Sequence, residues 1–222
     1  MEERSLFEET VDQAMNYMKD KYGEEFKPVC YDLADYLSRK DGVECVVDGM
    51  DPEKERIFIS VEMENNVLVF HDSYAGTLLR SQMEKYIYEM IKDEFADGKV
   101  YCDNINTILS DELGRDSSIK DFYTEHPSYR ICVKAYVRKG DISEDEFGDK
   151  IAKIENKLIE SGHRFTICIR ALENEEYEGV TRFDQKKYQE ALNRELIDEQ
   201  TNAYSYYATI SNGEVRKYGR TE

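Results

Sequence analysis

Two alternating segments on either side of an amphipathic helix constrain most strongly how this chain can fold. In "SYRICVKAYVR" and in "RFTICIRAL" every second residue is apolar, which is the period of a half-buried β-strand. Between them, Ser143 and Glu146 form a capping box for a helix that ends at Gly162. The apolar stripe of that helix consists of Phe147, Ile151, Ile154 and Leu158. This part of the chain is therefore predicted to form a strand, a helix and a second strand.

The remainder of this part continues with alternating elements. A second helix is predicted from about Asp184 to Glu199, and "AYSYYATIS" and "EVRKY" then form a hairpin across Asn212 and Gly213. Asn and Gly suit this turn because they tolerate the positive φ angles of a tight two-residue hairpin. From residue 128 onward the predicted order is β-α-β-α-β-β.

The beginning of the chain shows a helical pattern over residues 5–22, which ends at Gly23. Three strands follow, "VECVVDG", "RIFISVEME" and "VLVF", and the last two are joined by a turn at Asn65 and Asn66. An apolar stripe over residues 79–95 then predicts a helix, and "GKVYCDN" predicts another strand. The predicted order of this part is α-β-β-β-α-β.

Residues 24–42 allow two interpretations. Pro28 disfavours a central strand, because proline cannot donate a hydrogen bond to a neighbouring strand. The segment "YDLADYL" fits either a short helix or an irregular strand. The sequence leaves this choice open.

Together these patterns predict an α+β protein of two modules, with helices packed on one face of mainly antiparallel sheets. The first module comprises residues 1–103. A polar connection over residues 104–127 is broken by Gly114 and Pro127. The second module comprises residues 128–222.

The tripeptide His71-Asp72-Ser73 contains the three residue types of a hydrolase triad. A triad requires the histidine to lie between the other two side chains in space. Adjacent residues of an extended segment point to opposite faces and cannot achieve this. Asp72 or Ser73 is instead well placed to cap a helix that begins near Tyr74. The tripeptide is therefore predicted to be structural.

The chain is strongly acidic. Its 222 residues include 48 Asp and Glu against 30 Lys and Arg, which gives a formal net charge of -18. This charge repels the phosphates of nucleic acids and anionic membrane surfaces, and it attracts basic protein surfaces. We therefore expect a partner protein with a basic patch, and no direct binding of nucleic acid.

Five cysteines are spread along the chain without a C-x-x-C pair, which argues against a zinc knuckle and a redox motif. Their odd number argues against a full disulfide framework. Cys132 and Cys168 lie in predicted strands and are expected to be buried, reduced thiols. No segment resembles a signal peptide or approaches the roughly 18 apolar residues that a membrane span needs. We expect a soluble, cytoplasmic protein without membrane insertion, unless a leader or an anchor lies outside the given sequence.

Residues 10–102 resemble a group of uncharacterised proteins from Gram-positive bacteria. The resemblance rests on a helix ending in "YMKDKYGEEF", a β meander, and "HDSY" before a helix and a "KVY" strand. The segment "PVCYDLADYLSRKD" departs from the plain strand expected after "YGEEF". Because the group has no assigned activity, the resemblance implies a related fold and a bacterial source, and it implies no function.

The sequence contains no recognisable catalytic, cofactor-binding or metal-binding motif. Its glycines are not spaced as in a phosphate-binding loop, and "DISEDEFGDKIA" lacks the glycine of a calcium loop. His71, His126 and His163 have no second His or Cys at zinc-ligand spacing. Only the fold could bring a histidine to Cys30 or Cys102. We therefore predict no cofactor, and this interpretation leans away from an enzyme without excluding one.

The leading hypothesis is a non-enzymatic protein-binding or accessory module with an acidic, tyrosine-rich surface. Tyrosine suits recognition because its apolar ring carries a polar tip. The predicted interaction surface comprises Glu144, Asp145, Asp149, Glu173, Glu175, Glu176, Glu178, Tyr204, Tyr206 and Tyr207. One alternative is an acidic inhibitor or nucleic-acid mimic that binds a basic groove, which requires carboxylates in a phosphate-like row. Another is an enzyme of unrecognised type, which requires a pocket with convergent reactive side chains.

Overall fold

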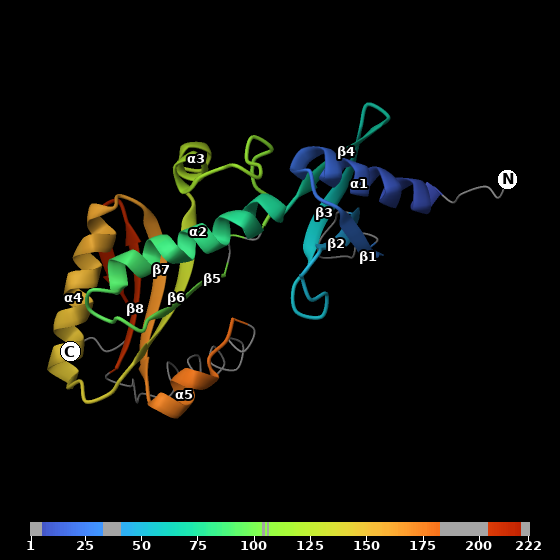
Figure 1. Ribbon diagram of the computed structural model, residues 1–222. Helices are drawn as coiled ribbons and strands as arrows, with labels where there is room; N and C mark the ends of the chain where they lie inside the picture. The colour runs from blue at the N-terminus through green and yellow to red at the C-terminus, as the bar shows by residue number, and fades with distance from the viewer. Residues whose placement is uncertain (1–5, 33–40, 104, 106, 183–203, 219–222) are drawn as a thin grey trace. The chain divides into compact units, whose positions relative to one another are not determined.

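The computed structural model of the protein describes residues 6–32, 41–103, 105, 107–182 and 204–218 (Figure 1). The chain forms two compact units, and each unit contains helices and one sheet. The first unit comprises Met1–Arg80 and Ile105–Glu125, and the second comprises Ser81–Asn104 and His126–Glu222. The protein is therefore α+β with two mainly antiparallel sheets, as the sequence predicts.

The first unit contains a four-stranded antiparallel sheet with the strand order β1-β2-β3-β4. Its strands are β1 (Phe26–Asp32), β2 (Asp41–Val47), β3 (Ile57–Glu64) and β4 (Val67–Asp72). Its helices are α1 (Leu6–Tyr22), the beginning of α2 (Tyr74–Ile91) and α3 (Ile119–Glu125).

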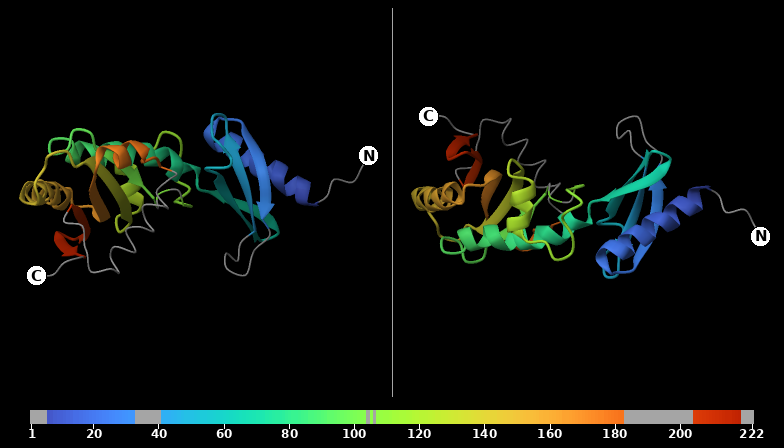
Figure 2. Two further views of the ribbon diagram at one scale, coloured as in Figure 1. Left: turned by 90° about the horizontal axis from the view of Figure 1, so that it is seen from below. Right: turned by 90° about the horizontal axis from the view of Figure 1, so that it is seen from above.

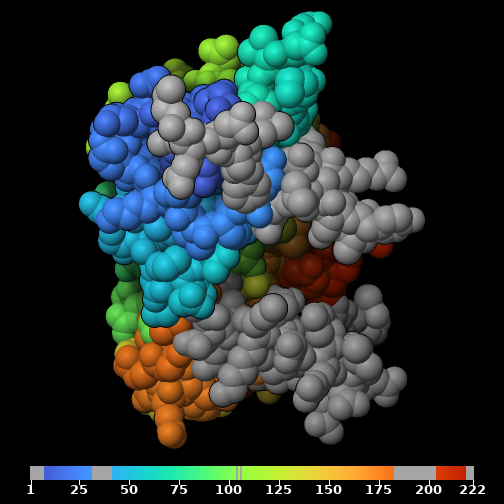
Figure 3. Space-filling model, turned by 90° about the vertical axis from the view of Figure 1, so that its right-hand side faces the viewer, coloured from blue at the N-terminus to red at the C-terminus, as the bar shows by residue number. Residues whose placement is uncertain are grey.

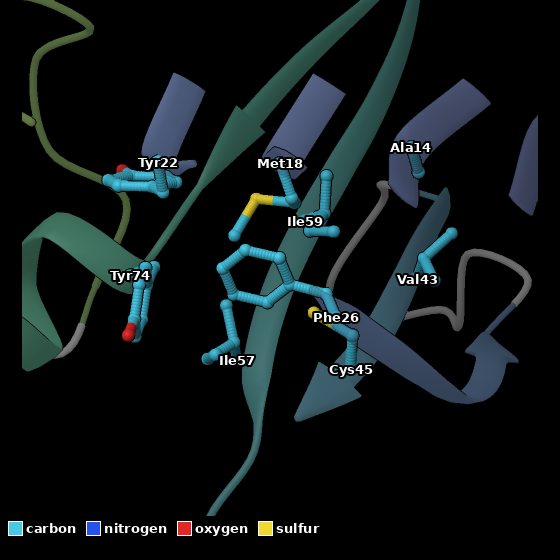
Figure 4. Packing of buried hydrophobic residues seen from close by; sticks show 9 residues of the cluster. All are labelled: Ala14, Met18, Tyr22, Phe26, Val43, Cys45, Ile57, Ile59 and Tyr74. Atoms are coloured by element: carbon cyan, nitrogen blue, oxygen red, sulfur yellow. The ribbon is translucent and has the colours of Figure 1, made fainter. Parts of the chain in front are cut away.

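One side of α1 packs on one face of this sheet, and Figure 4 shows the core that results. The core residues are Ala14, Met18, Tyr22, Phe26, Val43, Cys45, Ile57, Ile59 and Tyr74. The rings of Tyr22 and Phe26 both meet Tyr74 edge to face, with centroids 4.9 and 5.2 Å from it. Such pairs add to the stability gained from burial alone. Aromatic packing therefore joins the end of α1 to the start of α2.

The segment that the sequence left open forms strand β1, up to Asp32. It lies at the edge of the sheet, and the pairing with β2 is irregular between Pro28 and Cys30. An edge strand with a bulge tolerates proline, because the missing N–H costs no ladder hydrogen bond there. The objection to a central strand was thus correct, and residues 33–40 of the open segment lie outside the described residues.

The second unit contains a five-stranded sheet with the strand order β5-β6-β7-β8-β9. Strands β6 and β7 are parallel, and the other neighbouring strands are antiparallel. Its strands are β5 (Lys99–Cys102), β6 (Arg130–Arg138), β7 (Arg164–Leu172), β8 (Ser205–Ser211) and β9 (Glu214–Lys217). Its helices are the remainder of α2, α4 (Glu144–Glu160) and α5 (Asn174–Gly179).

The two faces of this sheet have different environments. The inner face is covered by α4 and by the part of α2 that belongs to this unit (Figure 2). Its buried strand residues are Ile131, Val133, Ala135, Val137, Phe165, Ile167, Ile169, Ala208 and Ile210. On the outer face, α5 packs at one end, where Tyr177 joins a cluster with Tyr136 and Leu172. The rest of the outer face carries polar side chains and thiols, which form a candidate site described below.

Several local predictions are confirmed. Ser143 accepts a hydrogen bond from the backbone of Glu146, and Glu146 accepts one from the backbone of Ser143, so the capping box of α4 is complete. Asn212 and Gly213 both have positive φ angles in the β8–β9 turn. The predicted helix from Asp184 to Glu199 lies outside the described residues.

The expected boundary of the first module requires a correction. Strand β5, which was assigned to residues 1–103, pairs with β6 and so belongs to the second sheet. Helix α2 contributes residues to both units, and residues 105–125 return to the first unit. The polar, Gly-containing segment predicted as a connection has the composition of a linker. Its buried Ile105, Leu113 and Phe122 show that it packs as part of the first unit.

Candidate functional site

His71, Asp72 and Ser73 point to three different environments in the first unit. His71 Nδ1 lies 2.9 Å from Asp111 Oδ2, whereas the hydroxyl of Ser73 accepts a hydrogen bond from the N–H of Phe58 at 3.0 Å. Asp72 accepts a hydrogen bond from the N–H of Tyr74, the first residue of α2, at 2.8 Å. The helix cap predicted at Asp72 is confirmed, and the three side chains do not converge on one another.

Asp72 has a second role that the sequence did not reveal. Its side chain is fully buried and ion-paired with Lys21, whose ammonium lies 2.9 Å from Oδ2. The hydroxyls of Tyr17 and Tyr22 donate to the same carboxylate at 2.9 and 2.7 Å. A buried carboxylate requires both a counter-charge and filled acceptor positions, and this site supplies both. The carboxylate at the end of β4 thus fastens the last turns of α1 and the start of α2.

The tyrosines of this network act as hydrogen-bond donors. Burial, followed by the negative charge of Asp72, raises the pKa of Tyr17 and of Tyr22 well above the usual value of about 10. The same two causes raise the pKa of the Cys45 thiol to about 12. All three groups remain protonated at neutral pH, so the network is suited to holding elements together rather than to accepting protons.

The histidines do not assemble a metal centre with the neighbouring ligands. His71 faces Asp111, and the rings of His126 and His163 lie near Tyr129 and Tyr86 respectively. Within the ranges that the structure describes, no three His, Cys, Asp or Glu side chains are close enough to hold a metal ion.

The two acidic runs predicted to form an interaction surface begin at the same end of the second sheet. Strands β6 and β7 are parallel and end side by side, where the N–H of Lys139 donates to the carbonyl of Leu172 at 2.9 Å. Helix α4 follows β6, and α5 follows β7. We call the exposed carboxylates there the acidic end: Glu144, Asp145, Asp149, Glu173, Glu175, Glu176 and Glu178.

The chain's own cations neutralise part of the acidic end. The ammonium of Lys139 lies 2.7 Å from Glu173, and Arg138 forms an ion pair with Glu178. The hydrogen bond from Arg138 lowers the pKa of Glu178 below its usual value. The remaining carboxylates with no ion pair to a described residue are Glu144, Asp145, Asp149 and Glu175. Among the described residues, no cation competes with an external one for these four carboxylates.

The three predicted tyrosines do not share one surface. The Tyr204 ring packs against Phe147 in the first turn of α4, with centroids 5.9 Å apart, and so lies beside the acidic end. Tyr206 is only 8% exposed and donates to Glu155 of α4 at 2.8 Å, so it belongs to the inner face. Tyr207 lies on the outer face, because successive strand residues point to opposite sides. The prediction that Tyr206 belongs to the interaction surface is therefore wrong.

The outer face of the second sheet contains an open pocket of about 280 Å³. It is lined by Asp103, Cys132, Val133, Lys134, Thr166, Cys168 and Tyr207. Lys134 and Asp103 form an ion pair at its wall. The volume is slightly below the range of about 300–1,000 Å³ typical of drug-sized ligands, so the pocket suits only a small molecule.

The thiols in this pocket are not activated nucleophiles. Burial raises the pKa of Cys168 to about 11, and it also raises the pKa of Cys132. Because the thiolate is the reactive species, both side chains are poorly reactive at neutral pH. The pocket therefore gathers polar groups without the low-pKa thiol that cysteine catalysis requires.

Thiol alkylation tests this assignment. The alkylation rate of Cys168 in the folded protein should rise about tenfold per pH unit from pH 7 to pH 10, because the thiolate fraction increases until the pH reaches the pKa. In urea the rate should level off near pH 8.5, the usual pKa of a thiol. Peptide mass spectrometry after iodoacetamide pulses measures both profiles. A plateau at or below pH 8 in the folded protein would contradict the assignment and favour an enzyme.

The sequence contains part of the information needed to predict the pocket and the inward orientation of Tyr206. Ala208 and Ile210 share the parity of Tyr206, and this alternation already indicates an inward tyrosine. Cys132 and Cys168 occupy the polar positions of their alternating strands, and they are half-buried in the pocket lining rather than fully buried as expected. Only the pairing of β6, β7 and β8 brings these side chains to one face.

Comparison with known proteins supports the fold and provides no information on chemical function. No protein family model and no curated protein matches the sequence. Among solved structures, the chain is similar to the crystal structure of a DUF5037 family protein from Ruminococcus gnavus, with 17% identity and a TM-score of 0.51. The similarity covers 93% of this chain and 94% of the other. In the described part of this chain, no helix has the length and apolar character to cross a membrane.

Proposed function

We propose that this protein is a non-enzymatic binding module that recognises a basic segment of another protein through the acidic end of its second unit. The observation that carries the proposal is a group of exposed carboxylates at the starts of α4 and α5, where β6 and β7 end together; four of them, Glu144, Asp145, Asp149 and Glu175, form no ion pair with a described residue. Complementary charge favours encounter with a basic partner and rejects acidic ones. The proposal includes a cytoplasmic location, which free thiols favour.

The internal ion pairs favour a protein partner over the function of a nucleic-acid mimic. A mimic needs carboxylates in an uninterrupted, phosphate-like row. Glu173 and Glu178 are already paired with Lys139 and Arg138, so the run on α5 is interrupted. Tyr204 adds an aromatic ring to the acidic end, and the ammonium of Lys139 lies over this ring, 4.6 Å from its centroid. A mixed acidic and aromatic surface suits a peptide with both basic and apolar residues.

Neutralising three carboxylates of α4 tests the proposal. The variant Glu144→Gln, Asp145→Asn, Asp149→Asn should bind a Lys/Arg-rich ten-residue peptide about tenfold more weakly at low salt, because each partly exposed ion pair contributes about 0.2–1 kcal/mol. Surface plasmon resonance at two salt concentrations measures the affinity and the association rate. Glu146 is left unchanged because it caps α4.

A matched control makes the same change in net charge elsewhere. Glu112→Gln, Asp116→Asn, Glu125→Gln alters three exposed carboxylates of the first unit. This control should change the affinity less than twofold. Equal weakening by both variants would reduce the effect to net charge and contradict a specific acidic site.

The outer-face pocket supports small-molecule binding as a second candidate function. The observation in its favour is the convergence of the Lys134–Asp103 ion pair, two thiols and two hydroxyl side chains on one hollow. The thiol titration described above decides whether this candidate extends to catalysis. A low-pKa thiol would favour an enzyme, and two high-pKa thiols favour binding alone.

A further inference from the structure

The edges of the two sheets differ in how they are protected against pairing with another strand. Natural proteins protect an edge with proline, bulges, charged residues, short strands or a covering element. Edge strand β1 carries Pro28 and an irregularity directly after it. Edge strand β9 spans Glu214–Lys217, and three of its residues, Glu214, Arg216 and Lys217, are charged. Both edges are thus poor templates for a further strand.

The third edge, β5, is short and covered. The N–H of Cys102 donates to Glu84 at 2.9 Å, so a side chain already occupies that backbone donor. The ammonium of Lys99 donates to the carbonyls of Tyr177 and Val180 at 2.7 and 3.0 Å. These contacts hold α5 and the residue after it beside β5, which closes this edge to another chain.

The fourth edge, β4, shows no proline, bulge or covering strand among the described residues. Its first four residues, Val67–Phe70, include no charge and no proline. The two-residue turn makes Glu64 and Val67 a hydrogen-bonded pair, and such pairs alternate along an antiparallel ladder. Leu68 and Phe70 therefore direct their N–H and C=O groups away from β3. No other described residue forms a hydrogen bond with these outward backbone groups.

The tip of the same hairpin exposes large apolar side chains. Met63 is 65% exposed and Val67 is 63% exposed. In Figure 3 the teal atoms of the β3–β4 hairpin project at the upper margin of the view. An open backbone edge beside exposed apolar side chains has the two elements of peptide recognition by strand addition: main-chain hydrogen bonds for affinity and alternate side chains for specificity.

We propose that β4 is a strand-addition site for an extended, alternately apolar segment of a partner protein with Lys or Arg at its ends. Glu64 lies on β3, next to β4 in the sheet, so an added strand would run about 10 Å from it. Charges at that separation still interact at moderate salt. The net charge of -18 disfavours a second copy of this chain as the occupant. The site lies in the first unit and is independent of the acidic end.

Amide exchange with a synthetic peptide tests the site. The probe is an eight-residue peptide of alternating Val and Thr with Lys at both ends. At saturation it should slow hydrogen exchange of the Leu68 and Phe70 amides at least about tenfold in NMR spectra, because both amides become hydrogen-bonded. A version that is N-methylated at every amide should produce no protection, because neither of its edges can pair, and a version with Glu at both ends should bind about tenfold more weakly.

Two variants separate backbone pairing from the apolar tip. Leu68→Pro removes an outward N–H and leaves the β3 hydrogen bonds in place, so peptide affinity should fall about tenfold. Val67→Lys and Val67→Glu alter an exposed side chain in matched ways without disturbing the core. The Lys variant should bind the Lys-ended peptide more weakly than the Glu variant, which keeps the test valid if Leu68→Pro fails to fold.

Three outcomes would overturn the proposal. Absence of protection at millimolar peptide would exclude strand addition at β4. Protection that grows with protein concentration in the absence of peptide, together with a dimer in sedimentation velocity, would assign the edge to a second copy of this chain. Equal affinity for the Lys-ended and Glu-ended peptides would reject the proposed partner chemistry.

Discussion

Replacing Asp72 by Ala is expected to destabilise the first unit by about 3 to 5 kcal/mol, which is the usual cost of breaking a buried ion pair by removing one partner. The substitution leaves the charge of Lys21 and the hydroxyls of Tyr17 and Tyr22 without their acceptor in a site where the carboxylate is fully buried. It also removes the acceptor for the first N–H of α2. Urea unfolding followed by circular dichroism measures the free energy of unfolding.

Asp111→Ala provides the control for this prediction. Asp111 also contacts Lys21, at 3.5 Å, and His71, but its side chain is 54% exposed. An exposed pair contributes about 0–1 kcal/mol, so this variant should remain close to the parent protein in stability. A similar loss of unfolding free energy in Asp72→Ala and Asp111→Ala would show that burial of the Asp72 carboxylate does not increase its contribution to stability.

Alkaline pH is expected to unfold the first unit with an onset near pH 10. The pKa values of Tyr17 and Tyr22 are raised by burial and by Asp72 in the folded state, whereas unfolded tyrosine has a pKa of about 10. Below pH 10 both states keep these protons, and the stabilisation is fully present. Above pH 10 the unfolded state releases protons that the folded state retains, so stability falls as the pH rises.

The double variant Tyr17→Phe, Tyr22→Phe tests the origin of this pH dependence. It should be less stable than the parent at pH 8, because Asp72 loses two hydrogen bonds. Its stability should nevertheless fall less steeply between pH 10 and pH 12. The control Tyr218→Phe alters a tyrosine that is 39% exposed and should keep the parent profile. Urea titrations at each pH give the comparison, and identical slopes for both variants would argue against the network as the source.

The predictions that succeeded depend on nearest neighbours along the chain. The capping box of Ser143 and Glu146 involves residues three positions apart, and the alternation in β6 and β7 repeats every second residue. Helix and strand periods are local properties, so they can be read without knowledge of the fold. That Pro28 does not lie in a central strand also follows from its own chemistry, since it lacks a donor, whereas the choice between a helix and an edge strand stayed open.

Other features depend on which distant segments meet. The four residues of strand β5 do not indicate in the sequence which sheet they join. Only their pairing with β6 places the strand in the second unit. The pattern around Asp72 predicts a helix cap correctly, but its other donors, Tyr17, Lys21 and Tyr22, come from α1, about fifty positions earlier in the chain. A carboxylate has the same local sequence whether it is solvated or buried, and only tertiary packing removes its water.

The sequence by itself determined the α+β class, the helix and strand segments with strong periodicity, and the acidic character of the surface. The tertiary structure decided which carboxylates of the acidic end are neutralised by described cations, because Arg138 and Lys139 reach Glu178 and Glu173 only when β6 and β7 end side by side. It also decided that β4 is an edge strand, since strand order is set by hydrogen bonds between distant segments. Periodicity depends on residues close in sequence, whereas counter-ions and sheet edges depend on contacts that only the folded chain creates.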